Sequence, residues 1–256
     1  MLMNVMVVFR RAARVCIFAL FALQASWVMA AEDIPFLTYH DAPPFIIDSE
    51  TEKGLTYDLA RWLSKNSGGK YRFVVGVVPR KRLDAMLGQP RPIVVPWVIP
   101  AWFEGVWIQN QYWTTPVLED RNVLVSRSGN FFEYTGPDSL SGKTVSGLRG
   151  GAWVGLDPLV EAGKISRIDA PNYFLAIKLV LNGRADVAMV PEPVARFFVE
   201  KEKIKGALHF SQKPHSSYMR RMLVSERIDV FQYLEAQVPK MVTDAAWQAA
   251  ITKIGL

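Results

Sequence analysis

The chain has 256 residues, of which 50% are hydrophobic, 12% aromatic and 21% charged, and it contains three histidines and one cysteine. This composition excludes a disordered protein, because disordered chains combine few aromatic residues with many charges. It also excludes a disulfide framework and a zinc ribbon, since no Cys/His pair has metal-ligand spacing. We therefore expect neither a metal site nor a cofactor.

The first 30 residues have the pattern of a cleavable export signal. Three arginines give a positive start, a nine-residue apolar run follows at 15–23, and Val28-Met29-Ala30 supplies a cleavage site. The run is much shorter than the roughly 20 residues that a membrane-spanning helix needs. An uncleaved anchor helix is the alternative. We expect residues 1–30 to be a signal peptide and the mature chain, which has no cysteine, to be periplasmic.

The positive charge does not indicate a nucleic-acid partner. The formal charge is +6, but cleavage after residue 30 removes three of the 30 basic residues, leaving 27 against 24 acidic ones, or +3. The remaining bases are scattered, apart from Arg80-Lys81-Arg82 and Arg220-Arg221. Two short clusters are more typical of a solvated surface than of a nucleic-acid interface.

The mature chain alternates between strand-like and helix-like segments. Strands are predicted at 36–39, 71–78, 93–95, 122–126, 143–147, 186–190 and 218–225. Helices are predicted at 56–64, 81–87, 172–182, 229–238 and 243–254. Pro96 is expected to end one strand, and Pro239 to divide the last two helices. This alternation predicts an α/β fold with largely parallel sheets.

Five short motifs occur in an order that is typical of one family. They are Tyr39-His40-Asp41-Ala42-Pro43-Pro44-Phe45, Gly54-Leu55-Thr56-Tyr57-Asp58-Leu59-Ala60, Trp113-Thr114-Thr115-Pro116, Ser139-Leu140-Ser141-Gly142-Lys143-Thr144-Val145 and Gly183-Arg184-Ala185-Asp186-Val187. Through these motifs the chain resembles the bacterial extracellular solute-binding proteins of family 3, the periplasmic receptors of polar amino-acid ABC importers. The resemblance covers nearly all of the mature chain.

The resemblance implies a two-lobe periplasmic binding protein fold of type II, with two crossing strands as the hinge and the ligand in the cleft between the lobes. The crossing strands are expected near 123–127 and 218–224. Lobe 1 would then comprise 31–124 plus 219–256, and lobe 2 would comprise 125–218. Such receptors are not enzymes, and they bind a small molecule by hinge closure. The implied partner is the membrane permease of an ABC transporter, and a monomer is expected.

Two positions that grip an amino acid in the family differ here. The family's carboxylate-binding arginine falls on Trp107, and no Arg or Lys lies between Pro92 and Glu119. The ammonium-binding aspartate falls on Pro191, with Glu192 beside it. The expected solute is therefore a small polar or amine-bearing, amino-acid-like molecule, and its identity stays open.

The site residues predicted in lobe 1 follow its strands. Ligands of α/β proteins bind at the carboxyl ends of strands, and aromatic faces stack on flat ligands or hold cations. The candidates are Tyr39, Asp41, Phe45, Arg80, Trp97 and Trp107, and the family motif adds Thr114. The alternatives are a core-covering role for the tryptophans, a local turn role for Asp41 and a surface position for Arg80.

In lobe 2 the predicted site residues are Arg149, Gly150, Gly151 and Glu192. The two glycines lie between a strand and a probable helix, where bare backbone N–H groups suit an anion and Arg149 adds charge. Glu192 takes the place of the displaced aspartate. The alternatives are a simple turn for the glycines and a helix-start acid for Glu192.

The expected function is capture of a solute for import. A periplasmic sensor subunit is one alternative, and a dehydratase-like enzyme on the same fold is another, with Glu192 or Asp41 as a general acid or base. His40, His209 and His215 lack metal-ligand spacing, and each is expected at the surface or in a loop.

Overall fold

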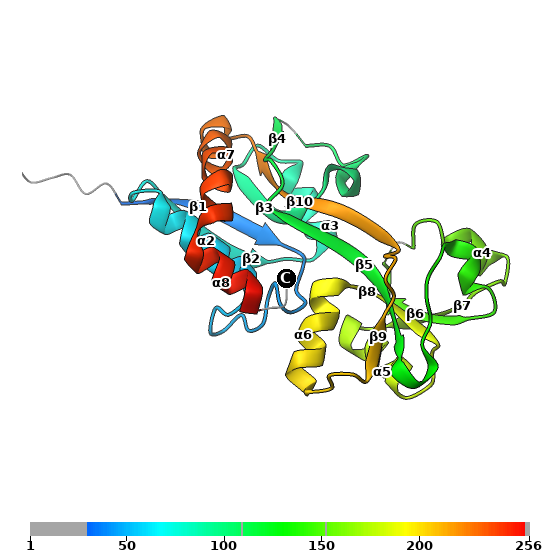
Figure 1. The fold of residues 1–256 in the computed structure, drawn as a ribbon. Coiled ribbons are helices and arrows are strands. Elements are labelled where there is room, and N and C mark those ends of the chain that lie inside the picture. Colours follow the sequence, from blue (N-terminus) through cyan, green and yellow to red (C-terminus); the bar gives the residue numbers. More distant parts are fainter. Residues whose placement is uncertain (1–29, 109, 152, 254–256) are drawn as a thin grey trace, which may run out of the picture. The chain divides into compact units, whose positions relative to one another are not determined.

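The computed structural model describes residues 30–108, 110–151 and 153–253 (Figure 1). The chain divides into two units, Met1–Ala31 and Glu32–Leu256, and every element named below lies in the second. The predicted signal peptide, residues 1–30, lies outside the described residues except for Ala30. None of the helices in the described part has the length and apolar character needed to cross a membrane.

The described strands form one hydrogen-bonded sheet in the order β2-β1-β3-β10-β5-β8-β6-β7, with β4 beside β10 and β9 beside β5. Their bounds are β1 Glu32–Thr38, β2 Tyr71–Val77, β3 Ile93–Val98, β4 Gln111–Trp113, β5 Leu118–Arg127, β6 Thr144–Leu148, β7 Ser166–Ala170, β8 Val187–Pro191, β9 Leu208–Phe210 and β10 Ser216–Ser225. β1 lies parallel between β2 and β3, and β6 lies parallel between β7 and β8. We call β2-β1-β3 the first half-sheet and β8-β6-β7 the second half-sheet.

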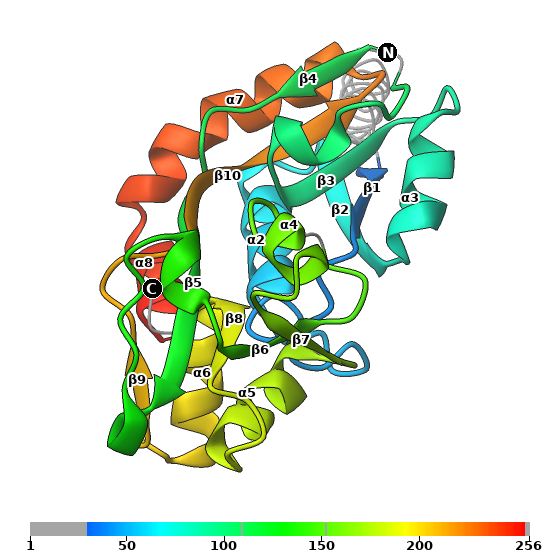
Figure 2. The ribbon, with the colours of Figure 1, turned by 90° about the vertical axis from the view of Figure 1, so that its right-hand side faces the viewer.

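Helices connect and cover these parallel strands (Figure 2). The first half-sheet carries α2 (Leu55–Asn66), α3 (Arg80–Leu87), α7 (Ile228–Thr243) and α8 (Ala245–Lys253), and the second carries α4 (Asp157–Glu161), α5 (Tyr173–Leu181) and α6 (Glu192–Glu202). Short 3-10 turns lie at Pro100–Phe103, Ser128–Asn130 and Pro137–Leu140. Strands alternating with helices confirm the predicted α/β class.

Two long antiparallel strands, β5 and β10, run between the half-sheets (Figure 1). They pair with each other from Ser216 opposite Asn122 to Arg220 opposite Leu118. Beyond that stretch β10 pairs with β3 and β5 pairs with β8. These are the crossing strands that the sequence predicted.

Each half-sheet has apolar clusters on both faces. In β3, Val94 packs in the cluster with α2 and α7, whereas Ile93 and Val95 pack in the cluster with α3. In β5, Val123 and Leu124 likewise belong to opposite clusters. Alternate side chains of a strand point to opposite faces, so strands covered on both sides need continuous apolar runs. This is why the short runs in this sequence predict buried strands correctly.

Two proline predictions were wrong. β3 continues through Pro96 to Val98, because β3 has an extra residue between Val95 and Val98, opposite Leu223 and Arg221 of β10, and a bulge tolerates a residue without an N–H donor. α7 continues through Pro239, and the helical break comes at Asp244, whose side chain accepts the Trp247 N–H at 2.8 Å as the start of α8.

Candidate functional site

A buried arginine lies where the crossing strands pass between the half-sheets. Arg220 is the last residue of β10 to pair with β5, and Arg221 is the first to pair with β3. The Arg220 side chain is only 2% exposed, so the expectation that Arg220-Arg221 is a solvated surface cluster was wrong for its first member. An ion removed from water costs several kcal/mol unless it is paired and hydrogen-bonded. The surroundings of Arg220 supply both.

The Arg220 guanidinium lies among polar groups from β5, from β3, from the end of β1 and from β10 itself. Nε donates to Asp120 Oδ2 at 2.6 Å, and Asp120 itself is fully buried. Nη1 donates to the carbonyl oxygen of Trp97 and lies 3.4 Å from Nε2 of His40. Nη2 lies 3.5 Å from the hydroxyl oxygen of Tyr218. The group is therefore held in one orientation.

Aromatic rings enclose the same guanidinium. Its Cζ lies 4.8 Å from the ring centre of Phe45 and 5.2 Å from those of Trp102 and Tyr218. Cations within about 6 Å of a ring centre are attracted by the ring quadrupole. We call this set of residues the Arg220 cluster: Arg220, Asp120, His40, Phe45, Trp102 and Tyr218.

The uncharged members of the Arg220 cluster stay uncharged at neutral pH. Burial, and then the charges of Arg220 and Arg80, hold the pKa of His40 well below its ordinary value of 6.5. The hydrogen bond between His40 and the Trp97 backbone, which raises the His40 pKa, does not offset these effects. Burial raises the pKa of Tyr218, and it raises the pKa of the neighbouring Tyr39 to about 12.

A tyrosine from the second half-sheet approaches the Arg220 cluster. Tyr173 is the first residue of α5, after the Asn172 cap whose side chain accepts the Leu175 N–H at 2.9 Å. Burial raises the pKa of Tyr173, and the charges of Arg220, Asp120 and Asp41 also act on that pKa. Tyr173 thus lies within electrostatic range of the ion pair on the crossing strands and of Asp41, which follows β1.

Three predicted lobe 1 residues belong to or border the cluster. The Tyr39 ring is 4.2 Å from that of His40, and Phe45 lies under the guanidinium. Arg80 is 3.5 Å from the Tyr39 hydroxyl and donates to the Trp102 carbonyl oxygen, but its Nε is paired with Asp84 at 2.7 Å. Arg80 is therefore half-buried and matched by an acid, not a free surface base.

Asp41 follows the end of β1, as Tyr39 does, but its surroundings differ from those of Tyr39. Its side chain is exposed and makes no hydrogen bond or ion pair with any residue that the structure describes. Asp41 directly follows His40, a member of the cluster, along the chain. It is available to an amine.

The side chains of the other predicted lobe 1 residues are not members of the Arg220 cluster. Trp97 has no exposed surface, donates from Nε1 to Thr56 Oγ1 at 3.0 Å and stacks on Trp247, which is the core-covering role. Trp107 is 67% exposed. Thr114 is buried, and its hydroxyl accepts the Met222 N–H at 3.0 Å. Trp97 meets the cluster through its carbonyl oxygen, which accepts from Arg220, and through its ring, whose centre is 5.4 Å from that of Phe45.

The predicted lobe 2 residues lie at the carboxyl ends of β6 and β8. Arg149 and Gly150 are exposed, and the Arg149 N–H bonds Ala170 at 2.8 Å, so this loop lies beside the chain leading to Tyr173. Gly150 has a φ of 71°, a conformation that glycine adopts without strain. The carbonyl oxygen of Gly151 accepts a bond from Arg167 at 3.2 Å.

The Glu192 carboxylate is paired with two arginines of the same chain. It begins α6, is 7% exposed, and accepts bonds from Arg121 Nη2 at 3.0 Å and Arg196 Nε at 2.8 Å. Burial alone would raise the pKa of Glu192, but the bonds from the two arginines outweigh it and the pKa is lowered. The structure therefore gives Glu192 a role as the buried centre of an Arg121–Glu192–Arg196 group.

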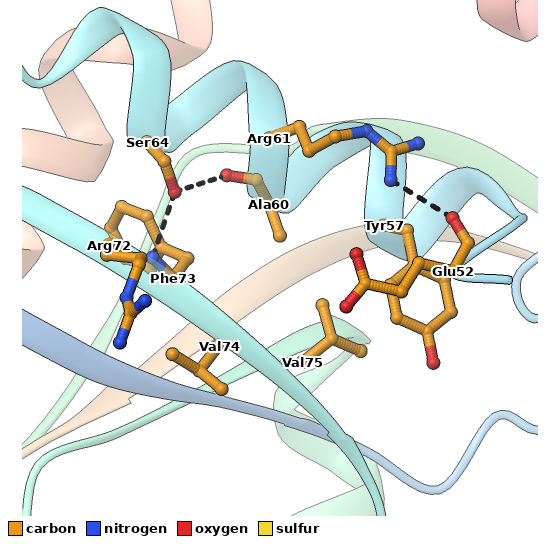
Figure 3. Close-up of a pocket in the computed structure, with 9 residues that line it drawn as sticks. All are labelled: Glu52, Tyr57, Ala60, Arg61, Ser64, Arg72, Phe73, Val74 and Val75. Atoms are coloured by element: carbon orange, nitrogen blue, oxygen red, sulfur yellow. Dashed lines mark hydrogen bonds between the residues drawn. The ribbon is translucent and has the colours of Figure 1, made fainter. Parts of the chain in front are cut away.

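A separate groove of about 450 Å³ lies between α2 and β2 (Figure 3). Glu52, Tyr57 and Val75 line part of it, and Ser64 joins its two sides by accepting the Phe73 N–H at 2.9 Å while donating to the Ala60 carbonyl oxygen at 2.7 Å. None of the Arg220 cluster residues lines this groove. In the described part of the chain, His, Cys, Asp and Glu form no group able to hold a metal ion.

Comparisons with known proteins establish the fold. No protein-family model and no curated protein sequence matches the chain. The GluR0 ligand-binding core from Nostoc punctiforme in complex with glutamate is similar in structure, with a TM-score of 0.65 and 17% identity over 87% of this chain and 99% of that one. A mutant of ArgBP from T. maritima has a TM-score of 0.65 and 20% identity over 86% of this chain and 94% of that one.

A third structure is an ancestral amino acid-binding protein that is a precursor of cyclohexadienyl dehydratase. It has a TM-score of 0.62 and 18% identity over 86% of this chain and 94% of that one. At identities of 17 to 20%, these likenesses show the fold alone. The chain has the two-lobe α/β fold of periplasmic binding proteins.

Proposed function

We propose that this protein binds a small solute between the two half-sheets, at the exposed border of the Arg220 cluster. The observation that carries the proposal is the position of the Arg220 cluster on the crossing strands, between Asp41, which follows β1 of the first half-sheet, and Tyr173, which follows β7 of the second. Asp41 and Tyr173 follow the carboxyl ends of parallel strands, which is where α/β proteins bind ligands.

The crossing strands β5 and β10 are the proposed hinge. The lobes they join are 31–124 plus 219–256 and 125–218, as the sequence predicts. A solute that contacts Asp41 and Trp102 on one lobe and Tyr173 on the other interacts with both only in the closed state. Binding therefore favours closure by its differential affinity for the two states. Such a receptor binds its solute without turning it over.

The polar groups at this border suit an amino-acid-like or amine-bearing solute. Asp41 offers an exposed carboxylate for an amine, and the exposed Arg149 side chain offers a positive charge for an anionic end. Support also comes from the similar structures, whose own ligands include glutamate and arginine. We further propose periplasmic location, a monomeric state and delivery to the permease of an ABC transporter, on the basis of the sequence resemblance.

A thermal-shift screen tests the proposed function. The protein, purified from the periplasm of a bacterial host, is heated with amino acids, polyamines, quaternary amines and small organic acids. A solute at 100 times its Kd adds about 2.7 kcal/mol of stability, or about 5 °C or more in Tm for a chain of this size. One chemical class should give such shifts. A folded protein that responds to nothing in the panel would overturn the proposal.

Two further readouts locate and define the activity. Tyr173→Phe should weaken the response to the solute, whereas Tyr57→Phe, which alters a hydroxyl beside the α2–β2 groove, should not. Solute recovered after long incubation should be chemically unchanged. A modified product would instead identify a dehydratase-like enzyme.

A further inference from the structure

We propose that Arg220 is a built-in guanidinium that fills the aromatic subsite of this protein, so that the bound solute places no cationic group there. This inference deepens the proposed function, on which its statement about the solute rests. It predicts that removal of the Arg220 side chain creates a new site for a free guanidinium ion. That second statement holds for the isolated protein whatever its solute is.

The geometry of the cluster is that of a bound ligand. Rings of Phe45, Trp102 and Tyr218 lie 4.8 to 5.2 Å from Arg220 Cζ, and the side chain is 2% exposed. The guanidinium therefore occupies the space that these rings enclose. A second cation would have to displace it while its own chain stays anchored in β10.

The hydrogen bonds show that Arg220 is committed to the protein. Nε is directed to Asp120, Nη1 to the Trp97 carbonyl oxygen and to His40, and Nη2 to Tyr218. A guanidinium has five N–H donors, and four of them have these partners. Arg220 therefore has no pair of free N–H donors with which to bind the carboxylate of a solute.

The charge balance makes the subsite specific for a cation once Arg220 is removed. Asp120 is fully buried, and Arg220 is its only ion-pair partner among the described residues. Burial raises the pKa of Asp120 even beside Arg220, and in Arg220→Ala this carboxyl group would have no counter-charge. A buried unpaired charge is strongly destabilising, so a planar cation that restores the pair should bind at a pH that keeps Asp120 ionised.

The next residue provides a matched control. Arg221 is also an arginine of β10, but it lies outside the ring of aromatic residues and donates from Nη1 to the Thr114 carbonyl oxygen at 2.6 Å. Arg221→Ala removes the same number of atoms and the same charge. It leaves the Asp120 pair intact and opens no aromatic subsite.

The experiment measures Tm of the Arg220→Ala and Arg221→Ala proteins with guanidinium chloride at low millimolar concentrations. Urea serves as a neutral molecule of the same shape, and sodium chloride matches the ionic strength. At ten times its Kd, guanidinium should raise Tm of Arg220→Ala by about 3 to 6 °C. Urea and salt should not, and Arg221→Ala and the unaltered protein should not respond. Equal responses in both variants would overturn the proposal.

A second variant covers the case in which Arg220→Ala does not fold alone. Refolding yield from urea by dilution is then measured with and without guanidinium. The refolding yield of Arg220→Ala should increase with guanidinium. The yield of the double variant Arg220→Ala, Asp120→Asn should not, because that variant has no carboxylate at position 120 to pair with the cation. Absence of rescue in the single variant, by Tm or by yield, overturns the inference. These outcomes do not depend on the solute screen, so failure of the proposed function is recognised separately.

Discussion

Arg220 and Asp120 form a buried ion pair across the two crossing strands, with Arg220 Nε 2.6 Å from Asp120 Oδ2 and side chains 2% and 0% exposed. Asp120 is directly opposite Tyr218 in the β5–β10 ladder, and Arg220 is two residues further along β10. The pair therefore ties together the strands that connect the half-sheets. Its geometry gives the sharpest stability prediction.

Asp120→Asn should lower the free energy of unfolding by about 3 to 5 kcal/mol, because the Arg220 charge stays buried without a counter-charge. Urea denaturation followed by circular dichroism measures this loss. Asp33→Asn is the control, since Asp33 pairs with Arg72 in a bridge whose side chains are 50% and 65% exposed. That change should cost at most about 1 kcal/mol. Similar losses for the two variants would contradict the account.

The neutral state of His40 predicts how stability depends on pH. Burial, Arg220 and Arg80 depress its folded-state pKa well below 6.5, so below about pH 6.5 the unfolded chain binds a proton that the folded chain does not. Stability is then complete above that pH and is lost as pH falls, at up to about 1.4 kcal/mol per pH unit for this group.

Thermal unfolding of the protein and of His40→Gln between pH 7 and pH 5 checks this. The variant should lose less stability on acidification than the unaltered protein. His215, whose pKa is also lowered chiefly by burial, titrates in both and cancels in the comparison. Parallel curves would show that His40 is not protected from protonation.

Trp97 and Trp107 should respond in opposite ways to truncation. Trp97→Ala removes a side chain with no exposed surface and its bond to Thr56, and should cost about 3 to 5 kcal/mol of stability. Trp107 is 67% exposed, so Trp107→Ala should change stability by no more than about 0.5 kcal/mol. Chemical denaturation of both variants decides the matter, and a large loss for Trp107 would be inconsistent with the structure.

Asp41→Asn tests the proposed amine contact. If Asp41 pairs with the amine of the solute identified by thermal shift, loss of its charge should weaken binding about tenfold, equivalent to about 1.4 kcal/mol. Calorimetric titration measures the change. Asp138→Asn, at another exposed aspartate, is the control. Unchanged affinity in Asp41→Asn would remove this residue from the site.

The fold could be predicted because its signals are local. Apolar runs, glycines and capping residues identified most of the strands and helices, including both crossing strands, but no pattern predicted β7 or α6. Arg220 could not be identified as buried, because its counter-charge lies 100 residues away in the sequence. The one available signal was its place within an otherwise apolar predicted strand.

The position of Trp97 shows a second limit of sequence patterns. Simple alternation would put Trp97 on the same face of β3 as Val95, yet Trp97 packs with Val94 and Val95 packs with Val98. The backbone at Trp97 has a φ of 68°, next to the register shift between β3 and β10. This local change of direction sends the indole into the core, and a period of two residues cannot reveal it.

The most direct test of solute binding at the Arg220 cluster is the indole N–H spectrum of protein labelled with ¹⁵N-tryptophan, recorded with and without the solute found by thermal shift. Single substitutions assign the Trp102 and Trp107 signals. Saturation with solute should move the Trp102 signal, because this ring belongs to the cluster, and should leave the exposed Trp107 signal in place. A shift of Trp107 with no change at Trp102 would contradict solute binding at the cluster.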